Sequence, residues 1–228
     1  MPQLPHVIVR LPHPRRALTA WQGALDQALQ SALVDSPIRR ELAQRLLRGD
    51  SVVWLLVASS DVERNRPVKK LLDEQCQALG GRIALPEGIG LPGSELYSDV
   101  PLLVQFSVLE IDRHDPQEQF LLQVFEHLQP EAFASDEPLV VPVFGRGRAL
   151  EVIPATVVTP QLVADLTIFL CGACSCQVKE QNPGFDLLLS ADWDRRLFGE
   201  GGLLPPPPRS VGEVDRSEPV LLTIPPGR

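Results

Sequence analysis

Residues 52–58 read Val-Val-Trp-Leu-Leu-Val-Ala, and this run decides the fold. A strand with one face in water alternates apolar and polar residues, whereas an unbroken apolar run is typical of a strand covered on both faces. The run is too short to cross a bilayer, because a spanning helix takes about 20 residues. It therefore predicts the central strand of an α/β domain with helices on both sides.

Capping residues and apolar spacing predict helices before and after this strand. Ser36 followed by Pro37 is a helix start signal. Residues 17–33 carry leucine and tryptophan at helical spacing and predict another helix just ahead of it, so that the first helix is doubled. Further helices are predicted at residues 64–79, after the Asp115–Glu118 segment, which has the spacing of a capping box, and after Thr159-Pro160.

Short β-branched or aliphatic runs between these helices predict the strands. They occupy residues 6–10, 51–58, 103–111, 139–144 and 148–153. The last two flank Gly145-Arg146-Gly147, which is typical of a hairpin turn. The predicted order is therefore β-α-β-α-β-α-β-β-α, a sandwich with a mixed central sheet.

This order resembles that of thioredoxin-like proteins, and local sequence supports the resemblance. Residues 53–58 followed by PVKKLLDE at 67–74 look like the central strand and active-site helix of a thioredoxin. LEIDRHDP at 109–116 looks like the strand that follows. Pro138, ahead of the strand at 139–144, is similar in placement to the family's cis-proline. The resemblance implies a thioredoxin-like fold over residues 50–170.

The redox motif of that family is not matched. The resemblance places its CxxC on Val62-Glu63-Arg64-Asn65, where this chain has no cysteine. A thioredoxin reaction at that helix is therefore excluded, and function has to be inferred from other residues.

A second resemblance is to an uncharacterised bacterial family. GACSCQVK at 172–179, NPG at 182–184 and the segment from DLLL at 186–189 to Asp192-Trp193 look like its C-terminal signature. Members of that family are often exported, which favours the cell envelope, although no N-terminal signal segment is visible in this chain.

Three of the four cysteines, Cys171, Cys174 and Cys176, lie within six residues. Three soft thiolates so close together could bind Zn, Cu(I) or an Fe or Co centre, and the C-x-x-C-S-C spacing resembles the metal-binding segment of the nitrile hydratase α subunit. A zinc ion would need a fourth ligand, from His114, His127 or water.

The same cluster has two other interpretations. Cys171 and Cys174 have the spacing of a redox CxxC, and Cys174 and Cys176 could form a disulfide. The cluster could also be structural and shape the turn that follows it. Cys76 is different, because it falls on the apolar face of the helix at 64–79, where a buried, inert thiol is expected.

Composition and charge limit the partners. The chain has 228 residues, 44% of them hydrophobic, and a net charge of −8, which argues against nucleic acid. We expect a domain at residues 5–200, with a cysteine-containing appendage at 171–200 and a proline-rich tail at 201–228. No motif indicates the oligomeric state.

The leading functional hypothesis is a non-redox thioredoxin-like module that binds an unknown protein partner. It follows from the lack of any convergent acid, base or nucleophile set besides the cysteines. The alternative is a metal-binding or thiol–disulfide protein that acts through Cys171, Cys174 and Cys176.

Overall fold

The computed structural model describes residues 5–11, 18–30, 33–80, 104–171 and 184–198. The strands are β1 (His6–Leu11), β2 (Leu18–Ala24), β3 (Asp50–Ala58), β4 (Gln105–Asp112), β5 (Leu139–Phe144), β6 (Arg148–Ala149), β7 (Ile153–Pro154) and β8 (Phe185–Asp186). The helices are α1 (Leu25–Gln30), α2 (Pro37–Leu47), α3 (Val62–Gly80), α4 (Gln119–Leu128), α5 (Pro130–Ala134), α6 (Pro160–Cys171) and α8 (Trp193–Phe198), with 3₁₀ helices η1 (Pro116–Glu118) and η2 (Ala155–Val157).

The central strand is β3, as the apolar run predicts. The main sheet has the order β4-β3-β5-β6-β8, and β7 also pairs with β5. β4 runs parallel to β3 while β5 runs antiparallel to it, with Leu55 opposite both Leu109 and Val141. The prediction of an α/β fold with a mixed sheet is therefore confirmed.

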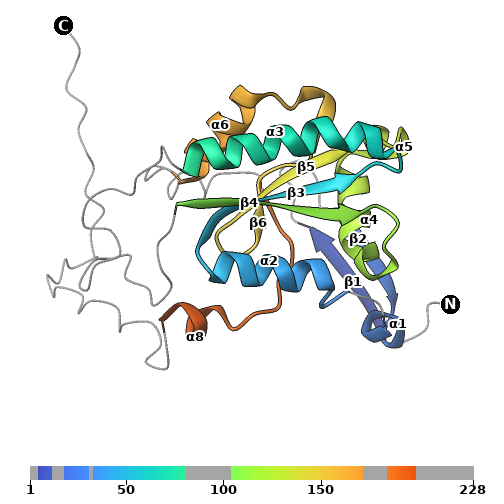
Figure 1. Cartoon of the computed structure of the whole chain (residues 1–228). Coiled ribbons are helices and arrows are strands. Elements are labelled where there is room, and N and C mark those ends of the chain that lie inside the picture. The colour runs from blue at the N-terminus through green and yellow to red at the C-terminus, as the bar shows by residue number, and fades with distance from the viewer. Residues whose placement is uncertain (1–4, 12–17, 31–32, 81–103, 172–183, 199–228) are drawn as a thin grey trace, which may run out of the picture.

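Side chains of β3 alternate between two cores. Val53, Leu55 and Val57 belong to one cluster, which we call the α2-side core, and Val52, Trp54 and Leu56 belong to the other, the α3-side core. Helices α2 and α4 with the β1–β2 hairpin cover the first face of the sheet, and α3 and α6 cover the second (Figure 1). Residues 52–57 of β3 are almost completely buried, which explains why no polar residue interrupts the run.

The predicted helix at residues 17–33 is wrong. β2 occupies Leu18–Ala24 and pairs antiparallel with β1, and among the described residues of this range only the six of α1 are helical. Two helices, α1 and α2, do precede β3, but the first of them is much shorter than predicted. Thr19, Trp21 and the helix-weakening Gly23 favour a strand, and β1 supplies the partner strand that the apolar spacing of residues 17–33 could not reveal.

The hairpin contains a β-bulge that brings two neighbouring residues to its inner face. The register is shifted between Val9 and Arg10, so that Val9 lies opposite Trp21 while Arg10 lies opposite Thr19. Ala20 is the extra residue. It packs in the α2-side core together with the adjacent Trp21, which strict alternation along a strand would not allow.

The predicted strand at residues 148–153 is interrupted. It forms β6 and β7, two residues each, separated by residues 150–152. The carbonyl of Pro142 in β5 accepts the N–H of Leu150, so the N atom of Pro142 also faces this segment. Because proline has no N–H to donate, the ladder breaks there.

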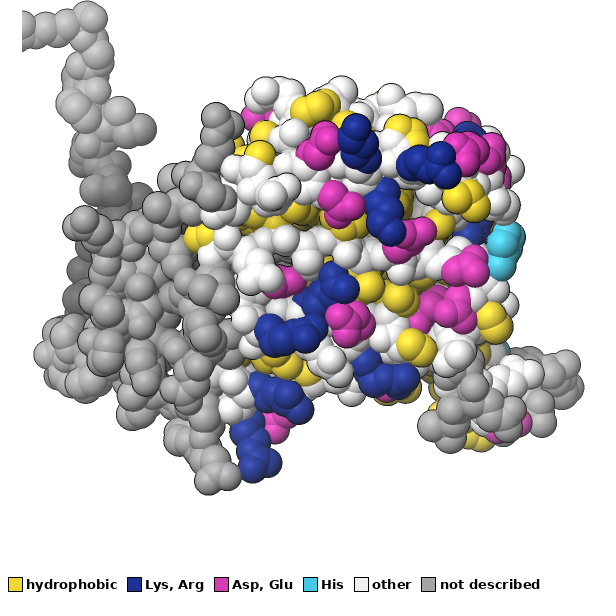
Figure 2. All heavy atoms as spheres, in the orientation of Figure 1, with side chains coloured by type: hydrophobic (Ala, Val, Ile, Leu, Met, Phe, Trp, Pro, Cys, Tyr) yellow, Lys and Arg dark blue, Asp and Glu magenta, His cyan; other side chains and the backbone are white. Residues whose placement is uncertain are grey.

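Charged side chains lie along the edge strand β4, which pairs only with β3 among the described strands. Arg45 of α2 donates to the carbonyl of Val108 at 2.9 Å, and Lys69 of α3 pairs with Glu110 at 2.6 Å. Figure 2 shows acidic and basic side chains interspersed over this face. Such charges oppose pairing of the edge with another chain.

Among the described helices, none is both long and apolar enough to span a bilayer.

Candidate functional site

Cys76 lies on the buried side of α3, within the α3-side core. Burial, with the nearby negative charges of Asp73 and Asp50, raises the pKa of its thiol to about 12. The thiolate is the reactive form of cysteine. Cys76 is therefore inert at neutral pH in the folded protein.

Cys171 is the last residue of α6 and is half-buried against the α3-side core. Cys174 and Cys176 lie outside the described residues, so the metal and disulfide interpretations of this cluster stay predictions.

Both histidines proposed as zinc ligands, His114 and His127, lie on the described part of the chain. Within the described ranges, no group of three His, Cys, Asp or Glu side chains is arranged to hold a metal ion. Nδ1 of His127 lies 2.6 Å from the carbonyl of Gln123, and His114 contacts a serine described below.

Pro138 is buried directly before β5. Its carbonyl accepts the N–H of Ala155 at 2.9 Å, which ties the start of β5 to the segment after β7. The position is thus a packed junction at the end of the sheet where β3 and β4 finish.

The position assigned to the redox motif is the first turn of α3, directly after β3. There, Asn65 is buried and its carboxamide holds the turn from both sides. Its Oδ1 accepts the N–H of Ser59 at 2.7 Å, and its Nδ2 donates to the carbonyl of Ser59 at 2.9 Å. The strand-to-helix turn is therefore fixed by a side-chain amide.

Asp136, between α5 and β5, also binds this turn. Its carboxylate accepts the hydroxyl of Ser59 at 2.9 Å and the N–H of Ser60 at 3.0 Å, and it pairs with Arg113 at 3.3 Å. Burial pushes the pKa of Asp136 upward, but the hydrogen bonds from Ser60 and Ser59 and the charge of Arg113 outweigh it and lower the pKa. The ionised carboxylate is the form that this network stabilises.

Arg113 lies beneath Asp136 with its guanidinium buried. It donates to the carbonyls of Ala58, Phe133 and Glu137 and stacks over the ring of Phe133 at 4.5 Å. Burial lowers its pKa and the charge of Asp136 opposes this. We call Ser59, Asn65, Arg113 and Asp136 the strand-end network.

At the surface of this network, Ser60 meets His114. The Ser60 Oγ lies 2.8 Å from Nε2 of His114, a distance suited to proton exchange between hydroxyl and imidazole. No hydrogen bond to the other ring nitrogen of His114 occurs within the described part of the chain, so nothing there orients the ring as in a catalytic triad. A hollow of about 360 Å³ borders His114 on its α4 side.

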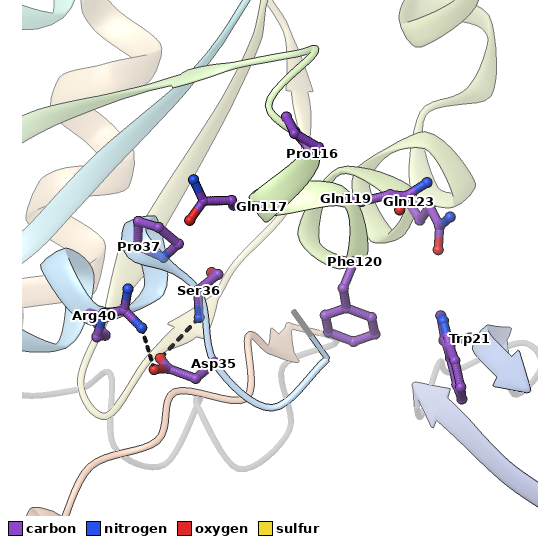
Figure 3. A pocket seen from close by; sticks show the side chains of 10 residues that line it. All are labelled: Trp21, Asp35, Ser36, Pro37, Arg40, Pro116, Gln117, Gln119, Phe120 and Gln123. Carbon is purple, nitrogen blue, oxygen red and sulfur yellow. Dashed lines mark hydrogen bonds and ion pairs between the residues drawn. The ribbon is translucent and has the colours of Figure 1, made fainter. Parts of the chain in front are cut away.

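A pocket of about 450 Å³ lies between the hairpin, the start of α2 and α4. We call it the hairpin pocket. Figure 3 shows the side chains that line it: Trp21, Asp35, Ser36, Pro37, Arg40, Pro116, Gln117, Gln119, Phe120 and Gln123. Trp21 and Phe120 face one another across it, and Asp35 pairs with Arg40 at its other end at 2.6 Å.

Beneath the pocket, a buried carboxyl joins two helices. The predicted capping box is half formed: Asp115 caps the N–H of Gln117 at 2.8 Å, but Glu118 does not return to Asp115. Oε1 of Glu118 instead accepts the N–H of Ile38 in the first turn of α2, at 2.7 Å. The neighbouring Arg39, only 1% exposed, stacks on the ring of Phe120 at 5.2 Å. The floor of the pocket is therefore rigid.

The sequence analysis predicted neither the strand-end network nor the hairpin pocket. Trp21 was expected on the core side of a helix, and its true position depends on a bulge that leaves no sequence signal. Ser59, Ser60 and Asp61 do carry a signal, because such residues often precede a helix. No family model, curated protein or solved structure matches the chain, so function has to be inferred from the residues alone.

Proposed function

We propose that this chain is a non-redox thioredoxin-like module that binds a partner. The arrangement of β3, α3 and parallel β4, followed by antiparallel β5 and β6 and then α6, supports the thioredoxin-like part of the proposal. So does the place of Pro138, directly ahead of β5 and near the carboxyl end of β3.

The strand-end network is the observation that carries the proposal. It occupies the turn between β3 and α3, where the resemblance places a pair of thiols. Asn65 stands at the second of those two positions, and its amide is used to hold Ser59. The turn is thus built for rigidity, which favours a preorganised binding surface over one that opens and closes a disulfide.

The groups left exposed around this network suit a protein partner. Val62, at the first turn of α3, is 66% exposed, and Ser60, two residues before it, shares an exposed hydrogen bond with His114. An apolar side chain with polar neighbours, held on rigid elements, is typical of a small protein-binding surface.

Thiol–disulfide exchange tests the proposal. We expect the reduced chain to reduce insulin disulfides no faster than dithiothreitol alone, and a Cys171→Ala/Cys174→Ala/Cys176→Ala variant to behave in the same way. Catalysis by the wild-type chain that disappears in the triple variant would contradict the proposal and favour the thiol–disulfide alternative.

Elemental analysis of chain purified without chelator tests the metal alternative. We expect no stoichiometric metal. One metal ion per chain in the wild type and none in the triple variant would replace the binding module by a thiolate metal site.

A further inference from the structure

The indole ring of Trp21 lies over Gly23 on its own strand. A Cβ atom at residue 23 would lie 2.8 Å from Cη2 of Trp21 and 2.9 Å from Oε1 of Gln27, closer than such atoms can approach. The glycine therefore lets the ring rest on the strand, and the bulge at Ala20 turns it to the inner face. The ring is half-buried at the side of the hairpin pocket, opposite Phe120 (Figure 3).

Three glutamine side chains also line the hairpin pocket. Gln117 belongs to η1, and Gln119 and Gln123 lie one turn apart on α4, on the same side of the helix. None of the three carboxamides makes a hydrogen bond within the part of the chain that the structure describes. Each carries both an acceptor oxygen and a donor nitrogen, so together they can bind a ligand whose polar groups both donate and accept.

The charges at the pocket cancel. Asp35 pairs with Arg40 through Oδ2 and accepts the N–H of Ser36 through Oδ1. A ligand with a net charge would gain little from this pair, because each member already neutralises the other. A purely apolar ligand would leave the three carboxamides without partners, which costs free energy.

We propose that the hairpin pocket binds a neutral sugar residue of a glycan. One C–H face of a pyranose ring stacks on the indole of Trp21, and its hydroxyl groups, each both donor and acceptor, pair with the carboxamides of Gln119 and Gln123. The volume of about 450 Å³ lies within the range of small-molecule sites. This inference goes beyond the proposed function, because the hairpin pocket shares no residue with the strand-end network.

Calorimetric titration with three neutral disaccharides, cellobiose, maltose and N,N′-diacetylchitobiose, tests the proposal. We expect saturable one-site binding of at least one of them, with a Kd in the millimolar range or below. Trp21→Ala abolishes the binding, and Gln119→Ala with Gln123→Ala weakens it by about tenfold. Gln22→Ala is the matched control, because Gln22 adjoins Trp21 but lies on the exposed outer face of the hairpin.

Gly23→Ala separates the position of the ring from its presence. The added methyl group pushes Trp21 off the strand without removing it, so we expect weaker sugar binding than in the wild type. A ring that served only as packing would leave any sugar affinity unchanged.

Three results would overturn the proposal. One is that none of the three disaccharides binds at millimolar concentration. Another is that the Trp21→Ala or double glutamine variant binds as the wild type does. The third is that a peptide with the sequence of residues 203–210, LLPPPPRS, saturates the pocket while the sugars do not. The hairpin pocket would then be a peptide-binding site. The thiol assay above does not involve the pocket, so it reports separately on the proposed function.

Discussion

Glu118 joins the starts of two helices, and its removal gives the sharpest test of how the domain is held together. The side chain has no exposed surface, and its Oε1 accepts the N–H of Ile38 at 2.7 Å. Glu118→Ala deletes this bond and leaves the N–H of Ile38 without its acceptor. Arg39 keeps its hydrogen bonds to Ser36 and to the carbonyl of Leu33, so its buried guanidinium still has hydrogen-bond acceptors in the variant.

The magnitude follows from these contacts. A hydrogen bond to a charged group contributes about 1.5–3 kcal/mol, and the small cavity left by the side chain adds about 1 kcal/mol. We therefore expect Glu118→Ala to lower the free energy of unfolding by about 2–4 kcal/mol. For a chain of this length each kcal/mol shifts Tm by about 2–4 °C, so Tm falls by about 4–16 °C.

The dependence on pH separates charge from packing. Burial raises the pKa of Glu118, which the hydroxyl of Ser36 and the N–H of Ile38 oppose only in part. The folded chain then binds a proton at a pH where the unfolded chain has lost it. The stability that this proton contributes is present below the ordinary Glu pKa and is lost as pH rises through the raised value. Glu118→Gln has no such loss.

Urea denaturation between about pH 4 and pH 8 measures both effects. Glu126→Gln is the control, because Glu126 lies exposed on α4, the helix that directly follows Glu118. If Glu118→Ala lowered the free energy of unfolding by less than about 0.5 kcal/mol, as surface substitutions typically do, Glu118 would not hold the two helix starts together. A parallel loss of stability in the wild type and Glu118→Gln as pH rises would also refute the reasoning.

Substitutions at three further positions test the strand-end network and the α3-side core by denaturant unfolding. Asp136→Ala should lower the free energy of unfolding by about 1–3 kcal/mol. Asp136→Asn should lower it less, because Asn tolerates the backbone φ of +53° at this position. Because the pKa of Asp136 is lowered in the folded chain, the stability that it contributes is present above the ordinary Asp pKa and is lost as pH falls through the lowered value. Cys76→Ala should cost about 1–2 kcal/mol, and in the folded wild type the thiol, with a pKa of about 12, should react with iodoacetamide only after unfolding. Trp54→Phe should change stability by less than about 1.5 kcal/mol, because Nε1 of Trp54 is a buried donor without a partner among the described residues.

The central strand and the start of α2 could be predicted because their signals are local. The run at 52–58 is apolar throughout because both faces of the strand are buried over residues 52–57. Ser36 accepts the N–H of Arg39 within its own helix turn, and Pro37 follows it at the first helical position. Neither signal depends on a distant residue.

The hairpin could not be predicted because its signal is ambiguous. Leucine and tryptophan at residues 18, 21 and 25 have the spacing of a helix, and a strand appears only once β1 pairs with it. Val7 and Val9 lie opposite Gly23 and Trp21, so the apolar face of the hairpin is shared between two segments. The strand-end network could not be predicted for the same reason, because it joins distant segments: Ser59 and Asp136 are hydrogen-bonded although 77 positions separate them in the sequence.

One short connection contributes residues to both the strand-end surface and the hairpin pocket. After β4 ends, Arg113 and His114 belong to the strand-end surface, Pro116 and Gln117 line the hairpin pocket, and Glu118 anchors the start of α2. Six consecutive residues thus couple a rigid turn on one side to a pocket wall on the other. If Glu118 holds this connection in place, Glu118→Ala should reduce amide exchange protection at the start of α2 and in the 113–118 segment together, whereas the loss of a merely local contact would affect α2 alone.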